Sequence, residues 1–427
     1  MRKNLGRLLW MLAAMSLAVG FALPAAGASV SRAKTPPSVP GFDGKTIKLG
    51  VLTPLSGIAS VIGKPLTNGN QTYWDAVNAA GGVGGKYKVQ LSTKDPNTAA
   101  ASDTKYDTAT ALQGYDQIKT DVVAFQQVLG TQIMQAVLQR LKADQLTAAP
   151  ATLDSLWVKV PQLVPIGAPY QVEAANGFDY YINKGGGKGK KICALVQDDD
   201  YGTAGLQGLN AAAKQLKFTV ASTAKFAATA TDVSAQVGQL ADAKCDAVFL
   251  ASLPNVTGSI VSKMIGRSFT PQILALAPSW LSGFESSPDS GAFYAQHFWL
   301  LSEGPNWGDT SVPGMAKMLG DLQKYSPDQK PDQYFAFGYA ESWAMDQVLE
   351  QAVKNGDLSK AGIQKALKQV GTLKFQNLVG DYLYGSSAAN RNPPRDTTIF
   401  KVVNGKPVGL DILVPSFVSP TAKALKF

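Results

Sequence analysis

The chain has very few of the side chains that bind metals or catalyse reactions. Its 427 residues include one histidine, His297, and two cysteines, Cys193 and Cys245. A histidine-based zinc site, a four-cysteine cluster and a disulfide-rich small fold therefore lack their ligands or bridges. No Gly-x-Ser-x-Gly elbow occurs, and His297 stands in an aromatic run that favours core packing over general-base chemistry. We expect a protein that is not an enzyme and that holds no metal and no cofactor.

Charged residues are also scarce, at 17% of the chain, whereas hydrophobic residues make up 45%. That composition is enough to bury the cores of two or three domains, and it excludes a disordered chain. The formal net charge of +9 raises the question of whether the protein binds nucleic acid. The lysines are spread along the chain without interleaved aromatic residues, however, so we expect no nucleic-acid partner.

A long apolar run, 8–23, occurs near the N-terminus. Basic residues precede it and the small residues 26–28 follow it, a pattern typical of an export signal. We expect a signal peptide at 1–28, a disordered spacer at 29–43, and no membrane insertion after cleavage. The run is shorter than the roughly 20 residues that span a bilayer, and an uncleaved anchor stays open as the alternative. No cysteine lies near the cleavage point, so we expect an exported protein, periplasmic or extracellular, without a lipid anchor.

Short apolar, β-branched runs alternate with helical patterns, which is typical of parallel sheets covered by helices on both faces. Early elements are a strand at 46–53, a helix at 69–80 and a strand at 121–125. After Pro161 the pattern starts again with a buried strand at 190–197. The sequence therefore predicts an α/β protein of two doubly wound lobes.

The C-terminal third is too small for another αβ domain, so it must complete both lobes. We assign 44–167 plus 300–373 to lobe 1 and 168–299 plus 374–427 to lobe 2. The chain then crosses between the lobes more than once, which makes a hinge.

The two cysteines lie near the starts of the first and third strands of lobe 2. In a doubly wound sheet of order 2-1-3 these strands are neighbours. Cys193 and Cys245 could therefore form a disulfide, and an oxidising setting outside the cell would preserve it. Two buried, unpaired cysteines are the alternative.

Several strand-to-helix turns carry hydroxyl groups at the carboxyl edge of the predicted sheets, where open α/β sheets bind ligands. Ser56 follows the first strand, Thr131 opens a helix, and Thr152 follows Ala151 at the end of a strand. Hydroxyls and free amides at helix N-termini suit a carboxylate, although such residues usually serve only as caps. Tyr201 is a further candidate at this edge, with plain packing as the alternative.

An acidic run, Asp198-Asp199-Asp200, stands between a predicted strand and helix. Carboxylates there could bind a cation or cap the helix N-terminus, and we favour capping.

Several stretches resemble the exported solute-binding proteins of ABC importers, of the branched-chain amino acid (leucine/isoleucine/valine) type. The resemblance runs from about residue 45 to the C-terminus. The stretches are IKLGVLTPLSG at 47–57, NAAGGVGGK at 78–86, VQDDDYG at 196–202 and FGY at 337–339.

This resemblance implies a two-lobed clamp of the type I periplasmic binding protein fold with a three-crossover hinge. It closes on a small-molecule ligand and presents it to ABC transporter permease subunits, and we expect a monomer. By matching positions, Thr131 and the Ala151-Thr152 turn would hold a ligand carboxylate, Tyr201 would close over it, and Tyr170 would stand on the first crossover.

Two positions depart from the family pattern. Val61-Ile62-Gly63 replaces an aromatic residue before glycine, which puts Ile62 in the ligand site. Asn255 stands where amino acid binders place an acid for the ligand ammonium, and a neutral amide cannot supply that charge. A ligand without an amine, aliphatic or aromatic, becomes more plausible. Trp280 could form an apolar wall, with core packing as the alternative.

We therefore expect a non-catalytic protein that captures a small carboxylate-bearing ligand, either branched-chain amino acid-like or a non-amino carboxylic acid, for ABC import. A ligand-sensing module that reports to a membrane receptor is the alternative. An exported enzyme on this scaffold is disfavoured because a nucleophile, base and metal constellation is missing.

Overall fold

The computed structural model describes residues 36–427, and within them the predicted α/β class with two parallel-dominated sheets is confirmed. The predicted signal peptide, 1–28, lies outside the described residues. The spacer was predicted to extend to residue 43. Phe42, however, is only 2% exposed and its backbone pairs with that of Ile47, so packed structure begins before the predicted end of the spacer.

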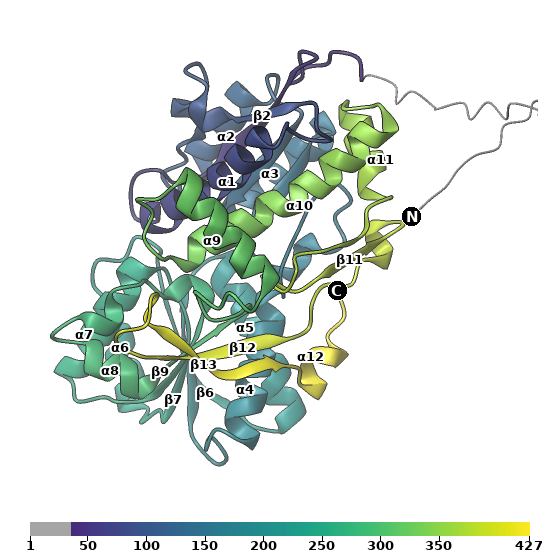
Figure 1. Ribbon diagram of the computed structural model, residues 1–427. Coiled ribbons are helices and arrows are strands. Elements are labelled where there is room, and N and C mark those ends of the chain that lie inside the picture. Colours follow the sequence, from purple (N-terminus) through teal and green to yellow (C-terminus); the bar gives the residue numbers. More distant parts are fainter. Residues whose placement is uncertain (1–35) are drawn as a thin grey trace, which may run out of the picture. The chain divides into compact units, whose positions relative to one another are not determined.

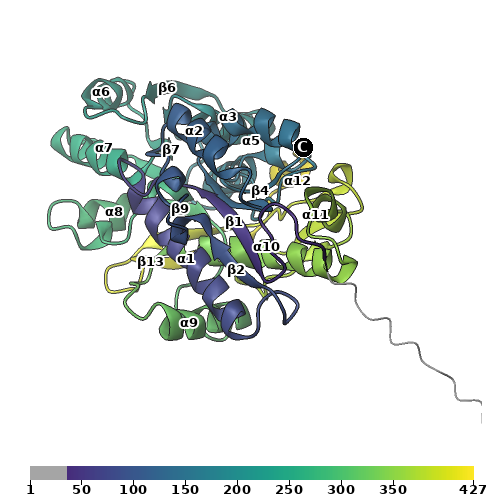
Figure 2. The same cartoon turned by 90° about the horizontal axis from the view of Figure 1, so that it is seen from above.

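Lobe 1, as we use the term here, is the four-stranded parallel sheet in the order β2-β1-β3-β4 with the helices packed on it. Ile47, Leu49 and Val51 enter the core beneath α1 and α10, whereas Leu52 enters the core beneath α2 and α3. Figure 2 shows these helix pairs on opposite sides of β1. Burial of both faces explains why apolar residues predominate in the central strands, β1 and β3. The elements are β1 (Thr46–Leu52), α1 (Ser60–Ala79), β2 (Lys88–Leu91), α2 (Thr108–Ile118), β3 (Ala124–Leu129), α3 (Thr131–Asp144), β4 (Thr147–Ala151) and α10 (Gln333–Asn355).

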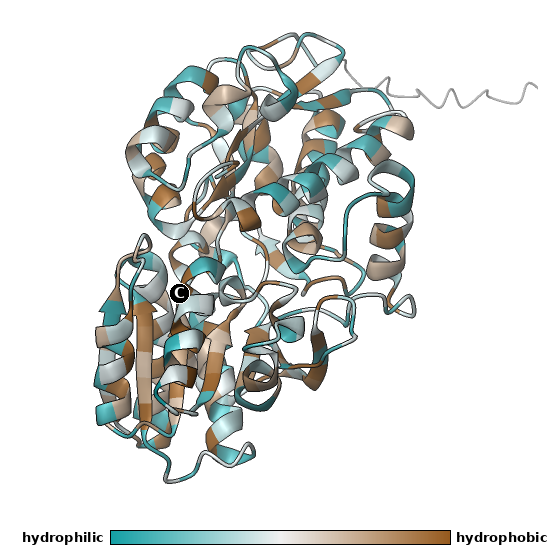
Figure 3. Cartoon of the chain, turned by 90° about the vertical axis from the view of Figure 1, so that its left-hand side faces the viewer, coloured by the Kyte–Doolittle hydropathy of each residue, from teal (hydrophilic) through white to brown (hydrophobic). Residues whose placement is uncertain are grey.

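Lobe 2 is the seven-stranded sheet in the order β13-β12-β9-β8-β7-β5-β6, with its helices. The five strands from β6 to β9 are parallel, and β12 and β13 add an antiparallel edge. Hydrophobic strands lie between the helices of this lobe (Figure 3). The elements are α4 (Tyr170–Asn183), β5 (Ile192–Gln197), α5 (Asp200–Leu216), β6 (Val220–Phe226), α6 (Ser234–Asp242), β7 (Ala247–Ala251), α7 (Pro254–Gly266), β8 (Gln272–Leu276), α8 (Gly291–His297), β9 (Phe298–Ser302), β12 (Thr397–Val402), β13 (Leu410–Phe417) and α12 (Pro420–Ala424).

Three segments carry the described chain between the lobes, as the three-crossover prediction requires. They are 152–169 between β4 and α4, 303–312 between β9 and α9, and 386–396 between β11 and β12. The residue ranges assigned to the lobes stay a prediction, and β9, which spans the predicted division at 299/300, pairs wholly within the second sheet. The remaining elements are α9 (Pro313–Tyr325), α11 (Lys360–Leu367), β10 (Gly371–Leu373) and β11 (Tyr382–Gly385).

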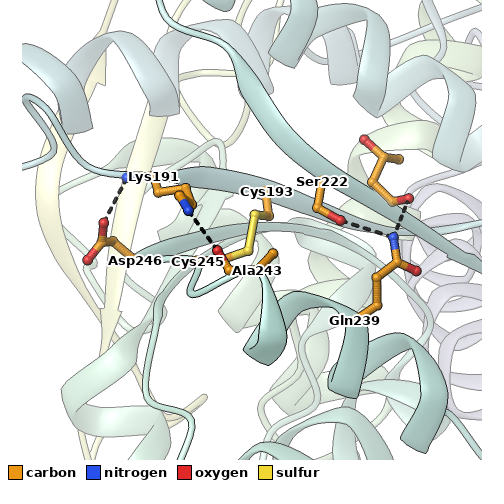
Figure 4. The surroundings of a disulfide bond; sticks show 8 residues. Lys191, Cys193, Ser222, Gln239, Ala243, Cys245 and Asp246 are labelled. Atoms are coloured by element: carbon orange, nitrogen blue, oxygen red, sulfur yellow. Dashed lines mark hydrogen bonds between the residues drawn. A yellow bond between two sulfur atoms is a disulfide. The ribbon is translucent and has the colours of Figure 1, made fainter.

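The structure joins Cys193 and Cys245 in a disulfide, with the two Cα atoms 5.9 Å apart (Figure 4). Cys193 stands on β5, and Cys245 just precedes β7, its neighbour in the sheet. Close by, the Lys191 backbone N–H donates to Asp246 over 2.8 Å. This is the amino end of the parallel strands, opposite the edge where the sequence places the ligand.

Helices of sufficient length and apolarity to cross a membrane are absent from residues 36–427.

Candidate functional site

A cavity that opens to solvent lies between the two lobes beside the crossover segments, and its interior together with the solvent space at its mouth amounts to about 1040 Å³. Its lining comes from α1, the end of β4, the first half of α10, the β8 and β9 ends, and the β12–β13 hairpin. Among the described residues no lysine, arginine or histidine lines it. We call it the hinge pocket, and its lining residues are Ile62, Leu66, Ala151, Thr152, Leu153, Tyr170, Ala277, Pro278, Ser302, Glu303, Gly304, Pro305, Asn306, Trp307, Met315, Gln333, Tyr334, Ala336, Phe337, Leu378, Val379, Phe400, Val408 and Leu410.

Four predicted site residues line the hinge pocket. Ile62 lies on the first turn of α1, the Ala151-Thr152 pair marks the end of β4, and Tyr170 begins α4. The Thr152 side chain and the Tyr170 hydroxyl interact there. They place hydroxyl groups at one end of an otherwise apolar lining.

Three polar side chains of the lining are already committed to the protein. Asn306 donates to Asp411 over 2.9 Å, Gln333 donates to a carbonyl at the end of β8, and the Tyr334 hydroxyl donates to the Trp280 carbonyl. The Thr152 hydroxyl contacts the Thr131 hydroxyl, but a hydroxyl can donate and accept at once, so Thr152, Tyr170 and Ser302 can still form hydrogen bonds to a ligand.

Two predicted site residues lie on the surface, away from the hinge pocket. Ser56 is exposed, and its hydroxyl donates to Asp103 over 2.6 Å. Asn255 is exposed on the first turn of α7. The structure does not bring these two side chains together with the pocket-lining residues, and their part in binding stays a prediction.

Three more predicted residues are buried outside the pocket lining. Thr131 lies behind Thr152, and their hydroxyl oxygens are 2.6 Å apart. Trp280 is fully buried, its Nε1 donates to the Val408 carbonyl over 3.0 Å, and its ring packs among aromatic side chains of lobe 2. Tyr201 is 2% exposed, and its hydroxyl has no partner within residues 36–427.

Four buried tyrosines lie close enough to influence one another, and two of them, Tyr170 and Tyr334, also line the hinge pocket; we call the four the tyrosine cluster. They are Tyr106, which precedes α2, with Tyr170, Tyr201 and Tyr334. The rings of Tyr170 and Tyr201 meet edge to face with centroids 5.1 Å apart. Burial raises the pKa of every hydroxyl in the cluster, so all four are neutral at physiological pH.

Nearby, the predicted capping role of the acidic run is confirmed at Asp199. Its side chain accepts from the Gly202 backbone N–H over 3.1 Å at the start of α5.

Glu303 is an acidic pocket residue that the sequence reading missed. Neither carboxyl oxygen has a hydrogen-bond partner in the described chain. Burial, with a smaller contribution from the negative charge of Asp396, raises the pKa of Glu303 to about 8. The side chain packs on Gly167 of the first crossover, where a β-carbon would come within 2.2 Å of Glu303 Oε1. Glu303 is therefore a largely neutral acid at neutral pH, held between crossover segments.

The other missed pocket residues come from the crossovers and the C-terminal elements. Trp307, Leu378 and Val379 stand in or near connecting segments without helical or strand periodicity. Gly304 and Pro305, shortly after a strand, could have indicated a functional loop, because loops at strand ends often carry binding residues.

Comparison with known proteins agrees with this architecture. The family described as periplasmic binding protein matches residues 46–407. A fatty acid ABC transporter substrate-binding protein from Thermomonospora curvata is 25% identical, with a TM-score of 0.82 over 91% of this chain and 97% of that one.

Two further solved structures share the fold. A branched-chain amino acid ABC transporter protein from Thermus thermophilus with bound valine is 12% identical, with a TM-score of 0.73 over 89% of this chain and 98% of that one. A leucine-binding protein from Thermotoga maritima is 16% identical, with a TM-score of 0.70 over 88% and 99%. The resemblance drawn from the sequence motifs is confirmed: the chain belongs to the periplasmic binding protein family and has the type I fold of ABC transporter substrate-binding proteins.

Proposed function

We propose that this protein captures a carboxylic acid with an apolar body, of the fatty-acid class, and delivers it to the permease of an ABC importer. The observation that carries the proposal is the chemistry of the hinge pocket. Apolar side chains dominate the lining, and hydroxyls gather at the Thr152 and Tyr170 end. The acid among the described lining residues, Glu303, has buried carboxyl oxygens. Such a site suits a ligand with one polar head and an alkyl or aryl body.

The hydroxyls of Thr152 and Tyr170 would donate to the ligand carboxylate, and hydrogen bonds to a charged group are worth about 1.5 to 3 kcal/mol each. The alkyl chain would lie against the apolar side chains between the crossovers and the β12–β13 hairpin. Each methylene group transferred there from water contributes about 0.8 kcal/mol. Affinity should therefore rise with chain length until the pocket is filled.

An α-amino acid is a poorer fit. Its ammonium needs an anionic partner, and Asn255 at the expected position is neutral and exposed. Glu303 is a weak substitute, because its raised pKa keeps it mostly protonated at neutral pH. The fatty acid binding protein named above shares more identity and a higher TM-score with this chain than the valine-bound structure does, which supports the same choice.

The family supports solute binding for transport, and we extend this to an exported monomer that acts outside the cytoplasmic membrane. The lobes would close on the ligand by small backbone changes in the three crossovers. The permease would then recognise the closed form.

The test is ligand binding measured by isothermal titration calorimetry on delipidated protein. Decanoate, decanol, decylamine and L-leucine separate the roles of the carboxylate, the chain and the ammonium. We expect decanoate to bind and, at a hundredfold excess over its Kd, to raise the free energy of unfolding by about 2.7 kcal/mol. L-leucine binding with no decanoate binding would refute the proposal.

A further inference from the structure

We propose that Tyr106 is a specificity-determining residue: its ring occupies the α3 N-terminus and excludes small carboxylates, so that ligands must enter the hinge pocket. The inference rests on the proposed function, because it explains where the recognised carboxylate does not bind. The observations behind it are the placement of the ring against Gly130, the packing of the ring between the lobes, and the backbone conformation of its turn.

The ring stands directly on the residue that precedes α3. A β-carbon on Gly130 would come within 2.8 Å of Tyr106 Cε2, so the glycine makes room for the ring. Gly130 has φ +105 and is the N-cap of this 14-residue helix. The amides at such a helix start carry partial positive charge and attract anions. Here an apolar ring covers them.

Tyr106 reaches from lobe 1 to lobe 2. It is 6% exposed and packs in one apolar cluster with Leu129 of β3 and Leu253 of lobe 2. On the far side its hydroxyl faces the Gln197 side chain and the Asp199 carboxylate. A small ligand could not reach the α3 N-terminus without displacing this ring.

The backbone of the turn shows that the placement is costly. Tyr106 has φ +62 and the preceding Lys105 has φ +52, the left-handed region that side chains other than glycine adopt rarely. Residues are held in this region only where the surrounding structure determines the backbone conformation. A glycine or an asparagine would satisfy the turn with less strain.

Polar groups beside the ring lack partners. The Tyr201 hydroxyl and Gln197 Oε1 are buried and make no hydrogen bond to other described residues. Buried polar atoms normally have a partner, and the Tyr106 hydroxyl influences both of these side chains. Removing the Tyr106 side chain would leave a cavity with Gly130 at the start of α3 on one side and the Gln197 side chain on the other.

The experiment replaces Tyr106 by glycine, which removes the ring and suits the positive φ. The Y106F variant keeps the ring, and Y106N is a second ring-free variant in case Y106G fails to fold. Binding of propionate and of decanoate is measured by calorimetry on the delipidated wild type and on each folded variant. Circular dichroism and thermal melting establish folding.

We expect no propionate binding by the wild type or Y106F, and at least a tenfold gain in propionate affinity for Y106G or Y106N. Decanoate affinity should change less than threefold, because the hinge pocket does not include Tyr106. A folded ring-free variant that gains no propionate affinity would overturn the inference, as would wild-type protein that already binds propionate equally well. Failure of decanoate to bind any variant would refute the proposed function alone, since the propionate result is read independently.

Discussion

The start of α3 and the hinge pocket both lie between the lobes, and side chains of the protein cover the first but leave the second open. At the α3 N-terminus a helix start and hydroxyl groups converge, yet protein rings occupy the space. A short distance along the cleft, Thr152 and Tyr170 border open space lined by apolar side chains. Strand-to-helix turns therefore indicate where polar groups gather, whereas neighbouring side chains decide whether a ligand has room.

The largest expected effect is on stability, and it comes from a disulfide that lies away from both of these regions. The double variant C193S/C245S removes a cross-link between residues 52 apart in sequence. The chain-entropy model then predicts a loss of about 4 kcal/mol in the free energy of unfolding. Decanoate affinity should stay unchanged, because the disulfide lies at the opposite edge of the sheet. Urea denaturation and calorimetry check the two quantities, and a parallel fall in affinity would show that the ligand site depends on that edge.

The next test fills the hinge pocket. A336W places an indole in the cavity, whereas A361W puts the same ring on an exposed position of α11. We expect A336W to weaken decanoate binding at least a hundredfold, a change of about 2.7 kcal/mol, and A361W to leave the dissociation constant unchanged. Equal binding by both variants would mean that the ligand lies elsewhere.

A third test uses Glu303, the acidic residue in the lining of the hinge pocket. The pKa of Glu303 in the folded protein, about 8, lies above the ordinary value of 4.5. The folded protein therefore keeps a proton that the unfolded chain releases, and stability that is full below pH 4.5 is lost as the pH rises through 8. Each unit of raised pKa corresponds to about 1.4 kcal/mol.

E303Q cannot ionise, so it should be more stable than the wild type at pH 9, with little difference at pH 4. The rise in pKa from 4.5 to about 8 corresponds to at most about 5 kcal/mol, and because the Glu303 residue is only half-buried, solvent screening reduces the expected gain to about 2 kcal/mol. Glu173 and Asp396 also act on this region, and both are unchanged in the variant. The exposed substitution D289N is the control. Chemical denaturation across this pH range checks the result, and parallel curves for E303Q and the wild type would show that Glu303 is already ionised.

The smallest effect compares two threonines that share one hydrogen bond. T131V and T152V both remove the contact between the hydroxyls, so each should cost about 1 kcal/mol of stability. Thr152 alone lines the pocket, and T152V should weaken decanoate binding about tenfold while T131V changes it less than threefold. A larger loss of decanoate affinity in T131V than in T152V would indicate that the ligand carboxylate binds at the α3 N-terminus instead.

Apolar patterning predicted the central strands well, because both faces of a parallel sheet are buried. The strand predicted at 190–197 corresponds to β5 (Ile192–Gln197). The strand predicted at 121–125 is wrong in its bounds, since β3 continues to Leu129 through Gln126 and Gln127. Both glutamines are fully buried, Gln126 accepts a hydrogen bond from Trp74 and Gln127 donates one to Thr53, and a prediction based on apolar residues cannot detect such pairing.

The helix predicted at 69–80 is α1, which begins at Ser60 and contains Pro65, a residue that normally marks a helix start or kink. The site was harder to predict than the fold. Motif positions led to Ile62, Thr152 and Tyr170, which line the pocket. They also led to Thr131 and Tyr201, which other side chains cover. Steric exclusion by Tyr106 depends on contacts between residues far apart in sequence, and local patterns do not record it.

The most direct test of the account is a crystal structure of the delipidated protein with decanoate. We predict electron density for the alkyl chain within the hinge pocket, its carboxylate within hydrogen-bond distance of the Thr152 and Tyr170 hydroxyls, and the Tyr106 ring still on Gly130. A carboxylate bound at the backbone amides of the α3 N-terminus, with Tyr106 displaced, would contradict it.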